Sequence, residues 1–210
     1  MIGKPEMVLN HSFTLDGVLH CRSQKQAEEI LKKITERFLN CGLEIHPEKS
    51  GIIYCKEKNR TASFERISFD FLGYTFRPRR CVNKQGLVHP NFLPAISRTS
   101  KKAINQEIRS WHIQLKNEKC LLDFSKMFNA ALIGWYNYYG RFYPSEMSSI
   151  WRSLNWYLIQ WVRSKYKRFA WHKSRAKEFL GRLAKTNQTL FLHWKLGAYP
   201  KGLNGGSRMS

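Results

Sequence analysis

The sequence predicts an α+β fold in which a small β-α-β-β unit is followed by an all-α domain. Apolar residues alternate with small or polar ones over short stretches near the N-terminus, with one helical repeat between them, and after Pro94 only helical spacing remains. The chain has 210 residues, 42% of them hydrophobic, which is enough for a packed core. We therefore expect a first domain at 1–94, a helical domain at 95–201 and a flexible tail at 202–210.

The first domain is predicted to contain one helix and three strands. Ser23, with Gln26 three residues later, has the pattern of an N-terminal capping box, so a helix should begin there. Gly42 follows the last apolar position and is a plausible left-handed stop. Strands are predicted at 17–21, 51–55 and 68–76.

The second domain is predicted to contain four helices. Thr99 or Ser100 caps the first, which reaches about Trp111 and has Ala103, Ile104 and Ile108 on its inner face. The others are predicted at 121–138, 145–169 and 173–184. The third of these helices has an apolar stripe made of Ile150, Leu154, Leu158, Trp161 and Val162.

Charge is the unusual quantity in this sequence. The chain has 36 Lys and Arg against 15 Asp and Glu, a net charge of +21. Residues 96–210 hold 21 of the basic and only 5 of the acidic residues, a net of +16, together with all 7 Trp. A cationic surface with large aromatic side chains indicates a nucleic-acid partner, and RNA fits better than a membrane because no apolar stretch is long enough to span a bilayer.

The cysteines and the N-terminus indicate an ordinary cytoplasmic protein. The 5 Cys are scattered and never spaced C-x-x-C, so neither a disulfide framework nor a zinc site is predicted. Residues 1–10 contain no apolar segment of the kind a secretory signal needs. We expect reduced thiols and a cytoplasmic location.

Three segments together carry a resemblance to a known family. They are Gly42-Leu-Glu-Ile-His-Pro-Glu-Lys-Ser50, then Phe71-Leu72-Gly73-Tyr74, and then Ile133-Gly134-Trp135-Tyr136-Asn137-Tyr138-Tyr139-Gly140. In order and spacing they resemble the late palm loop, the palm–thumb strand and the maturase-specific domain X of group II intron-encoded reverse transcriptases. The resemblance covers about residues 13–197. It implies a truncated palm remnant before a thumb-like helical domain, and intron splicing and mobility as the biological setting.

This sequence departs most clearly from the family's pattern at the positions of the polymerase site. The family's YADD motif, whose paired aspartates help hold two Mg²⁺ ions, corresponds here to Phe13-Thr14-Leu15-Asp16. Leu15 cannot ligate a hard cation, and Asp16 is left without its partner. The family's other metal-binding aspartate lies upstream, where this sequence has twelve residues without similarity. Lys49 matches a lysine thought to protonate pyrophosphate. We expect no stably bound metal, no cofactor and no DNA polymerisation by this chain alone.

The resemblance implies that domain X presents basic helical faces to intron RNA and to a primer–template RNA–DNA duplex. The predicted RNA-binding residues are Arg98, Lys101, Lys102, Arg109, Arg163, Lys165, Lys167, Arg168, Lys173, Arg175 and Lys177. Any one of these side chains can be an ordinary solvated cation, but the net charge of the domain is too large for that to explain them all. The aromatic residues from Trp135 to Tyr143 are expected to be mainly core.

Three functions remain open from the sequence. The first is a maturase-type RNA-binding protein inactive as a polymerase. The second is a reverse transcriptase subunit active only when another chain supplies the missing fingers and aspartate. The third is a basic nucleic-acid binder without intron preference. Unpaired sheet edges expected near Val18 and Phe69 are compatible with a complementing polymerase fragment.

Overall fold

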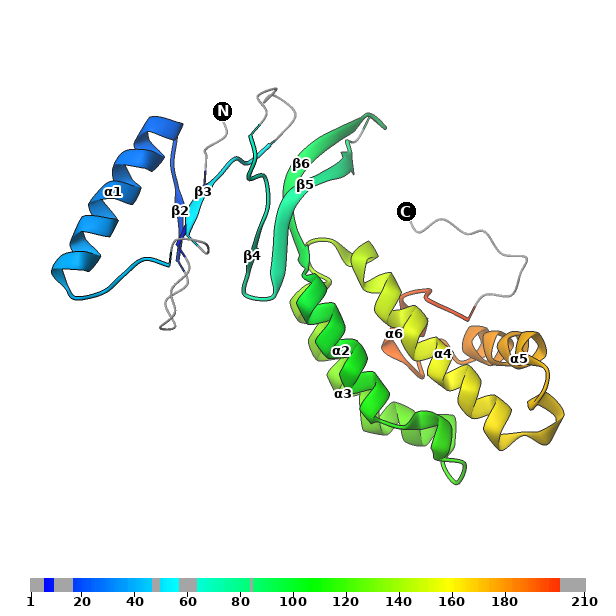
Figure 1. Cartoon of the computed structure of the whole chain (residues 1–210). Coiled ribbons are helices and arrows are strands. Elements are labelled where there is room, and N and C mark those ends of the chain that lie inside the picture. The colour runs from blue at the N-terminus through cyan, green and yellow to red at the C-terminus, as the bar shows by residue number, and fades with distance from the viewer. Residues whose placement is uncertain (1–5, 10–16, 47–49, 57–63, 84, 201–210) are drawn as a thin grey trace. The chain divides into compact units, whose positions relative to one another are not determined.

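The computed structural model describes residues 6–9, 17–46, 50–56, 64–83 and 85–200. Its internal contacts divide the chain into two compact units, Met1–Pro94 and Ala95–Ser210. The first unit holds the strands and one helix, and the second is helical, so the α+β class predicted from the sequence is confirmed (Figure 1). The two units are described separately.

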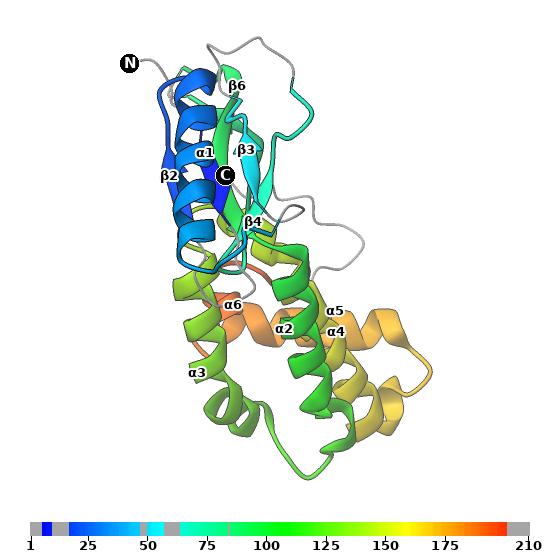
Figure 2. The ribbon, with the colours of Figure 1, turned by 60° about the vertical axis from the view of Figure 1, so that its left-hand side comes forward.

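The first sheet of unit one consists of β1 (Glu6–Leu9), β2 (Gly17–His20) and β3 (Gly51–Ile53). Its order is β2-β1-β3, and both pairings are antiparallel. The helix α1 (Gln24–Asn40) contacts β1 and β3 and lies alongside the strands of this sheet (Figure 2). Cys21 and Ala27 form the buried centre of this small core. The described part of the sheet leaves β2 as an edge strand, as the sequence predicted for Val18.

Both ends of α1 are fixed by the residues that the sequence singled out. Ser23 Oγ accepts a hydrogen bond from the Gln26 backbone N–H at 3.2 Å, which satisfies one of the free donors of the first turn. At the other end Gly42 has φ +71° and its N–H donates to the Leu39 carbonyl at 3.0 Å. The Leu43 N–H also donates to the Phe38 carbonyl at 2.9 Å, which completes a Schellman motif. Glycine suits this position because the left-handed region imposes no Cβ penalty on it.

The strand predicted at 68–76 is wrong, because the chain reverses in its middle. β4 (Phe69–Phe71) and β5 (Tyr74–Val82) form an antiparallel hairpin whose two turn residues, Leu72 and Gly73, have φ +46° and +79°. Two consecutive left-handed residues match the twist of a tight hairpin. The sequence offered only the glycine as a signal, since leucine is rarely found in that conformation.

The sequence also missed β6 (Val88–Ile96), which pairs with β5 to complete a second sheet of order β4-β5-β6. Prolines at 78, 90 and 94 explain the omission, because proline lacks the N–H of a ladder hydrogen bond and argues against a strand. Two of them lie in β6, an edge strand in the described sheet, where proline is tolerated. Pro78 lies beyond the last residue of β5 that pairs with β4, Phe76.

The described part of unit two consists of five α-helices and three short 3₁₀ helices. The α-helices are α2 (Arg98–Ser110), α3 (Leu121–Tyr139), α4 (Ser148–Lys165), α5 (Lys173–Thr186) and the short α6 (Leu192–Lys195), and the 3₁₀ helices are Ile113–Leu115, Pro144–Met147 and Lys167–Phe169. The four predicted helices are confirmed, except that 145–169 is one α-helix flanked by two 3₁₀ turns. The N-cap of α2 is Ser97 and neither Thr99 nor Ser100, since Ser97 Oγ accepts from the Ser100 N–H at 3.1 Å.

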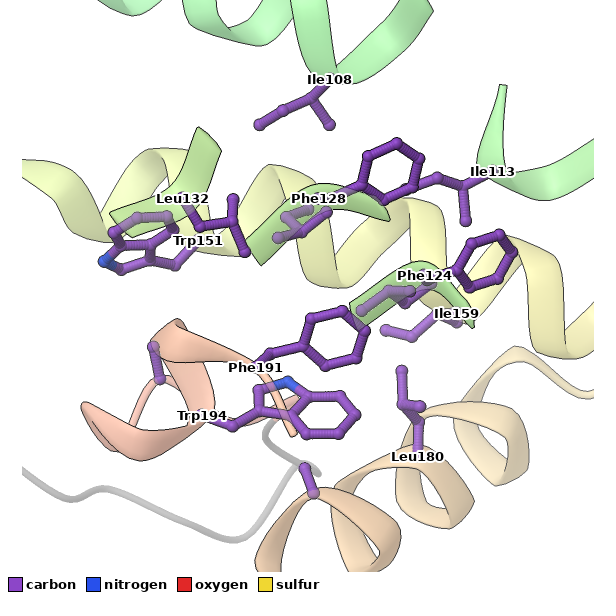
Figure 3. Close-up of a cluster of buried hydrophobic side chains, with 14 of the residues drawn as sticks. Ile108, Ile113, Phe124, Phe128, Leu132, Trp151, Ile159, Leu180, Phe191 and Trp194 are labelled. Carbon is purple, nitrogen blue, oxygen red and sulfur yellow. The ribbon is translucent and has the colours of Figure 1, made fainter. Parts of the chain in front are cut away.

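The core of unit two is built around α4. All five residues of its predicted apolar stripe are buried, and α2 adds Ile104 and Ile108, whereas Ala103 is exposed, against the prediction. The α3 helix adds Phe124, Phe128 and Leu132, which share one face at helical spacing (Figure 3).

The aromatic residues from Trp135 to Tyr143 are only partly core, because Trp135, Tyr136 and Tyr139 are partly buried and pack against it while others are exposed. Tyr138 and Phe142 are 48% and 51% exposed, and Trp135 is only partly buried, stacking on Trp111 with ring centroids 5.6 Å apart. The physical reason is helical geometry, because consecutive residues are turned by about 100° and cannot all face the same core.

The segment after α5 enters the core, which the sequence analysis did not predict. Phe191, His193 and Trp194 have no exposed surface, and Figure 3 shows Phe191 and Trp194 in one cluster with Leu180 of α5. Polar side chains of other helices hold this segment. Asn129 of α3 donates to the Leu190 carbonyl at 2.8 Å and accepts from the Leu192 N–H at 3.1 Å.

Candidate nucleic-acid-binding surface

The most basic stretch of unit two is residues 163–177, which joins α4 to α5. It contains seven of the predicted RNA-binding cations and no acidic residue. Aromatic packing holds the turn, because Phe169 lies 5.0 Å from Phe179 of α5 and Tyr166 lies 6.0 Å from the same ring, between ring centroids. Phe169 and Tyr166 therefore face inward, and most of the cations stay at the surface.

Arg163 and Lys165 have intramolecular roles within this stretch. The Arg163 guanidinium donates two hydrogen bonds to the Ala170 carbonyl, at 3.1 and 2.8 Å, and a third to Gln160 Oε1 at 2.9 Å. The Lys165 ammonium donates to the Lys119 carbonyl and lies 5.2 Å from the Trp161 ring centroid. Both cations thus stabilise the junction between helices, and their donors are partly occupied.

Lys101 also has an internal partner, since its ammonium forms a salt bridge with Glu146 across α2 and the 3₁₀ turn before α4. Arg168 is exposed, and its guanidinium lies over the Phe169 and Phe179 rings at 4.7 and 5.4 Å. That stacking orients the group while leaving its N–H edge available to a phosphate.

The remaining predicted cations have no hydrogen-bond or salt-bridge partner among the residues that the structure describes. They are Arg98, Lys102 and Arg109 on α2, Lys167 in the 3₁₀ turn, and Lys173, Arg175 and Lys177 on α5. All are exposed except Lys177, which is partly buried. Such side chains can exchange counterions for phosphates without breaking an internal contact.

Trp171 is the aromatic residue that sequence reasoning missed. It is 91% exposed and lies in the turn between Arg168 and Lys173. The sequence signal was available, since this tryptophan is enclosed by basic residues, but aromatic residues are more often core and nothing local distinguished it. An exposed indole among cations is suited to stacking on an unpaired base.

The signature residues on which the family resemblance rests lie in both units of the chain. Phe71, Leu72, Gly73 and Tyr74 form the hairpin of unit one, whereas Gly134, Trp135, Asn137, Tyr138 and Tyr139 lie on α3. Asn137 and Tyr138 are exposed, and a Cβ atom built at Gly134 would have nothing within 4 Å. The glycine therefore has no packing role in the described structure.

Leu15, Asp16 and Lys49, which the resemblance places at a polymerase site, lie outside the described residues. In the described ranges no three His, Cys, Asp or Glu side chains are grouped as metal ligands would be. Within those same ranges no helix is long and apolar enough to cross a membrane.

Comparison with known proteins gives one result. A family model described as "Group II intron, maturase-specific domain" matches residues 101–179, which run from α2 into α5 and include ten of the eleven predicted cations. Searches of curated proteins and of solved structures gave no match. Residues 101–179 of unit two are therefore similar to the group II intron maturase-specific domain.

Proposed function

We propose that this chain is a maturase-type RNA-binding protein that binds group II intron RNA through the phosphate backbone, in intron splicing and mobility. The observation that carries the proposal is the basic stretch 163–177, which lies inside the matched domain and has Lys167, Lys173 and Arg175 exposed without a described partner. Contacts of this kind position an RNA and give affinity, while unpaired bases provide specificity.

Filter binding to a group II intron RNA tests this function. The expected dissociation constant is below about 1 µM at physiological salt, tighter than the nonspecific range. The logarithm of the binding constant should fall with the logarithm of salt concentration by about 0.7 to 0.9 for each phosphate neutralised. An arbitrary RNA of equal length is the control. Equal affinity for both RNAs would contradict the intron function and favour a basic binder without preference.

We further propose that the chain alone does not polymerise DNA, because Leu15 stands where the family has a metal-binding aspartate. A single carboxylate at Asp16 cannot hold the metal pair that stabilises the attacking and leaving oxygens. Primer extension with RNA template, nucleotides and Mg²⁺ should give no product above background. Extension by the unmodified chain would show that the site is complete, and extension only on adding a fingers and palm fragment would favour the subunit alternative.

A further inference from the structure

We propose that a pocket between α4 and α5 binds one unpaired nucleotide of a single-stranded RNA segment. This inference deepens the proposed RNA-binding function and rests on it for the biological ligand. The pocket has a volume of about 560 Å³, within the range of small-molecule sites. The residues that define it chemically are Arg152, Trp156, Lys173, Lys177 and Tyr199.

The charge of the pocket selects an anionic ligand. Arg152 of α4 and Lys173 and Lys177 of α5 all line it, and none of its lining residues is acidic. These three cations have no hydrogen-bond or salt-bridge partner in the described part of the chain. Cations gathered at one opening without a counterion favour a phosphate, which would gain charge-assisted hydrogen bonds there.

The walls of the pocket are apolar and aromatic. Trp156 is 46% exposed although it lies in the middle of α4, and its ring packs edge-on against Tyr157 at 4.8 Å between centroids. Trp151 and Ile159 of the same helix also line the pocket and are buried, and Figure 3 shows both among the core side chains. An aromatic face beside cations suits a base with its phosphate, because the base can stack while the phosphate stays at the rim.

The third wall is the segment Ala198–Pro200, which two contacts fix in place. Asn155 Nδ2 donates to the Ala198 carbonyl at 2.8 Å, which ties the segment to α4. On α5, Gly181 allows the Pro200 carbonyl to approach so closely that a Cβ atom would lie 2.6 Å from its oxygen. Tyr199 is therefore held at the pocket by both helices, and the site is formed before any ligand binds.

Cations lie elsewhere on this domain too, so the proposal has to be distinguished from general attraction to phosphate. A pocket for one unpaired nucleotide requires a base that has left the stack, which a perfect duplex cannot supply. The pocket should therefore contribute to binding of a single strand and contribute little to binding of a duplex of similar length.

The test uses the full chain with two fluorescent probes, an oligouridylate of about 12 nucleotides and a blunt RNA duplex of about 12 base pairs. Trp156→Ala should weaken oligouridylate binding about tenfold and duplex binding less than twofold, and Trp156→Tyr should restore most of the loss. Lys173→Gln with Lys177→Gln should weaken the oligouridylate more than the matched pair Lys102→Gln with Arg109→Gln on α2. The proposal would be overturned if Trp156→Ala weakened binding of both probes equally, or if the two pairs of charge substitutions weakened oligouridylate binding equally.

Photocross-linking locates the base directly. An oligouridylate carrying 5-iodouracil should cross-link to the peptides that contain Trp156 or Tyr199, and cross-links confined to other peptides would overturn the proposal. The two functional claims fail separately. Cross-linking at the pocket without preference for intron RNA would contradict the maturase function alone, and intron preference with cross-links elsewhere would contradict the pocket alone.

Discussion

The buried side chains of Asn155 and His193 are joined by a hydrogen bond of 3.0 Å between Asn155 Oδ1 and His193 Nε2. Asn155 Oδ1 also accepts from Trp194 Nε1 at 3.1 Å, so the histidine must be the donor and its proton is on Nε2. His193 Nδ1 is then an acceptor without a partner among the described residues. Burial lowers the pKa of His193 to about 3, because a charged imidazolium would have no water around it.

Stability should therefore fall as pH decreases below neutrality. The unfolded histidine titrates near pH 6.5, so between pH 6.5 and about 3 the unfolded state binds a proton that the folded state does not. Between pH 7 and pH 5 His193 should cost about 2 kcal/mol of unfolding free energy. Urea unfolding followed by tryptophan fluorescence measures this in unit two, where all 7 Trp lie.

His193→Gln should remove that part of the pH dependence, because glutamine can still donate to Asn155 and does not titrate. His172→Gln, at an exposed position, is the matched control and should keep the full pH dependence. Identical pH profiles for wild type and His193→Gln would show that His193 is not the group responsible.

Asn155→Ala should destabilise unit two by about 3 kcal/mol, since it leaves the buried donors of His193 and Trp194 unpaired and frees the Ala198 carbonyl. The exposed Asn137→Ala on α3 should change the unfolding free energy by less than about 0.5 kcal/mol. Similar losses for the two variants in urea titrations would argue against the Asn155 network.

Gly134→Ala and Gly181→Ala should have opposite effects on stability. Alanine at Gly134 meets nothing within 4 Å and removes the conformational cost of a mid-helix glycine, so stability should rise by about 0.5–1 kcal/mol. Alanine at Gly181 would press on the Pro200 carbonyl and should lower the melting temperature. If thermal unfolding showed that both variants raise the melting temperature, or that both lower it, the packing described around the two glycines would be contradicted.

Two arginines of the basic stretch should have different roles, Arg163 in the stability of the fold and Arg175 in RNA binding. Arg163→Gln removes three internal hydrogen bonds and should cost about 1–2 kcal/mol in urea unfolding. Arg175→Gln, exposed on α5, should leave stability unchanged and reduce the salt dependence of intron RNA binding by about one phosphate contact. A stability loss for Arg175→Gln as large as that for Arg163→Gln would refute the division.

Trp171→Ala should weaken binding of single-stranded RNA by about 1–3 kcal/mol without loss of stability, because the indole is 91% exposed. Trp171→Phe should retain part of the affinity, since it keeps a ring face. Trp151→Ala is a useful contrast, because that side chain is buried and its removal should destabilise the fold by about 3–5 kcal/mol. An unchanged affinity for Trp171→Ala in fluorescence anisotropy would exclude stacking at this position.

Local signals predicted most of the elements correctly. Ser23 and Gly42 mark the ends of α1 because capping depends on residues within one turn. The α4 stripe was readable because its spacing alone defines one helical face. The hairpin at Leu72 was not readable, since a leucine in the left-handed region is dictated by the pairing of Phe69 with Phe76.

The sequence by itself determined the α+β class, the helices of unit two and the concentration of positive charge there, since each depends on composition or on neighbouring residues. Only the tertiary structure decided which cations are available, because Arg163 and Lys165 are occupied by the Ala170 and Lys119 carbonyls. It also decided that Trp171 is exposed while Trp194 is buried. The reason is that burial depends on which distant segments pack together, and the residues next to either tryptophan in the sequence do not predict that packing.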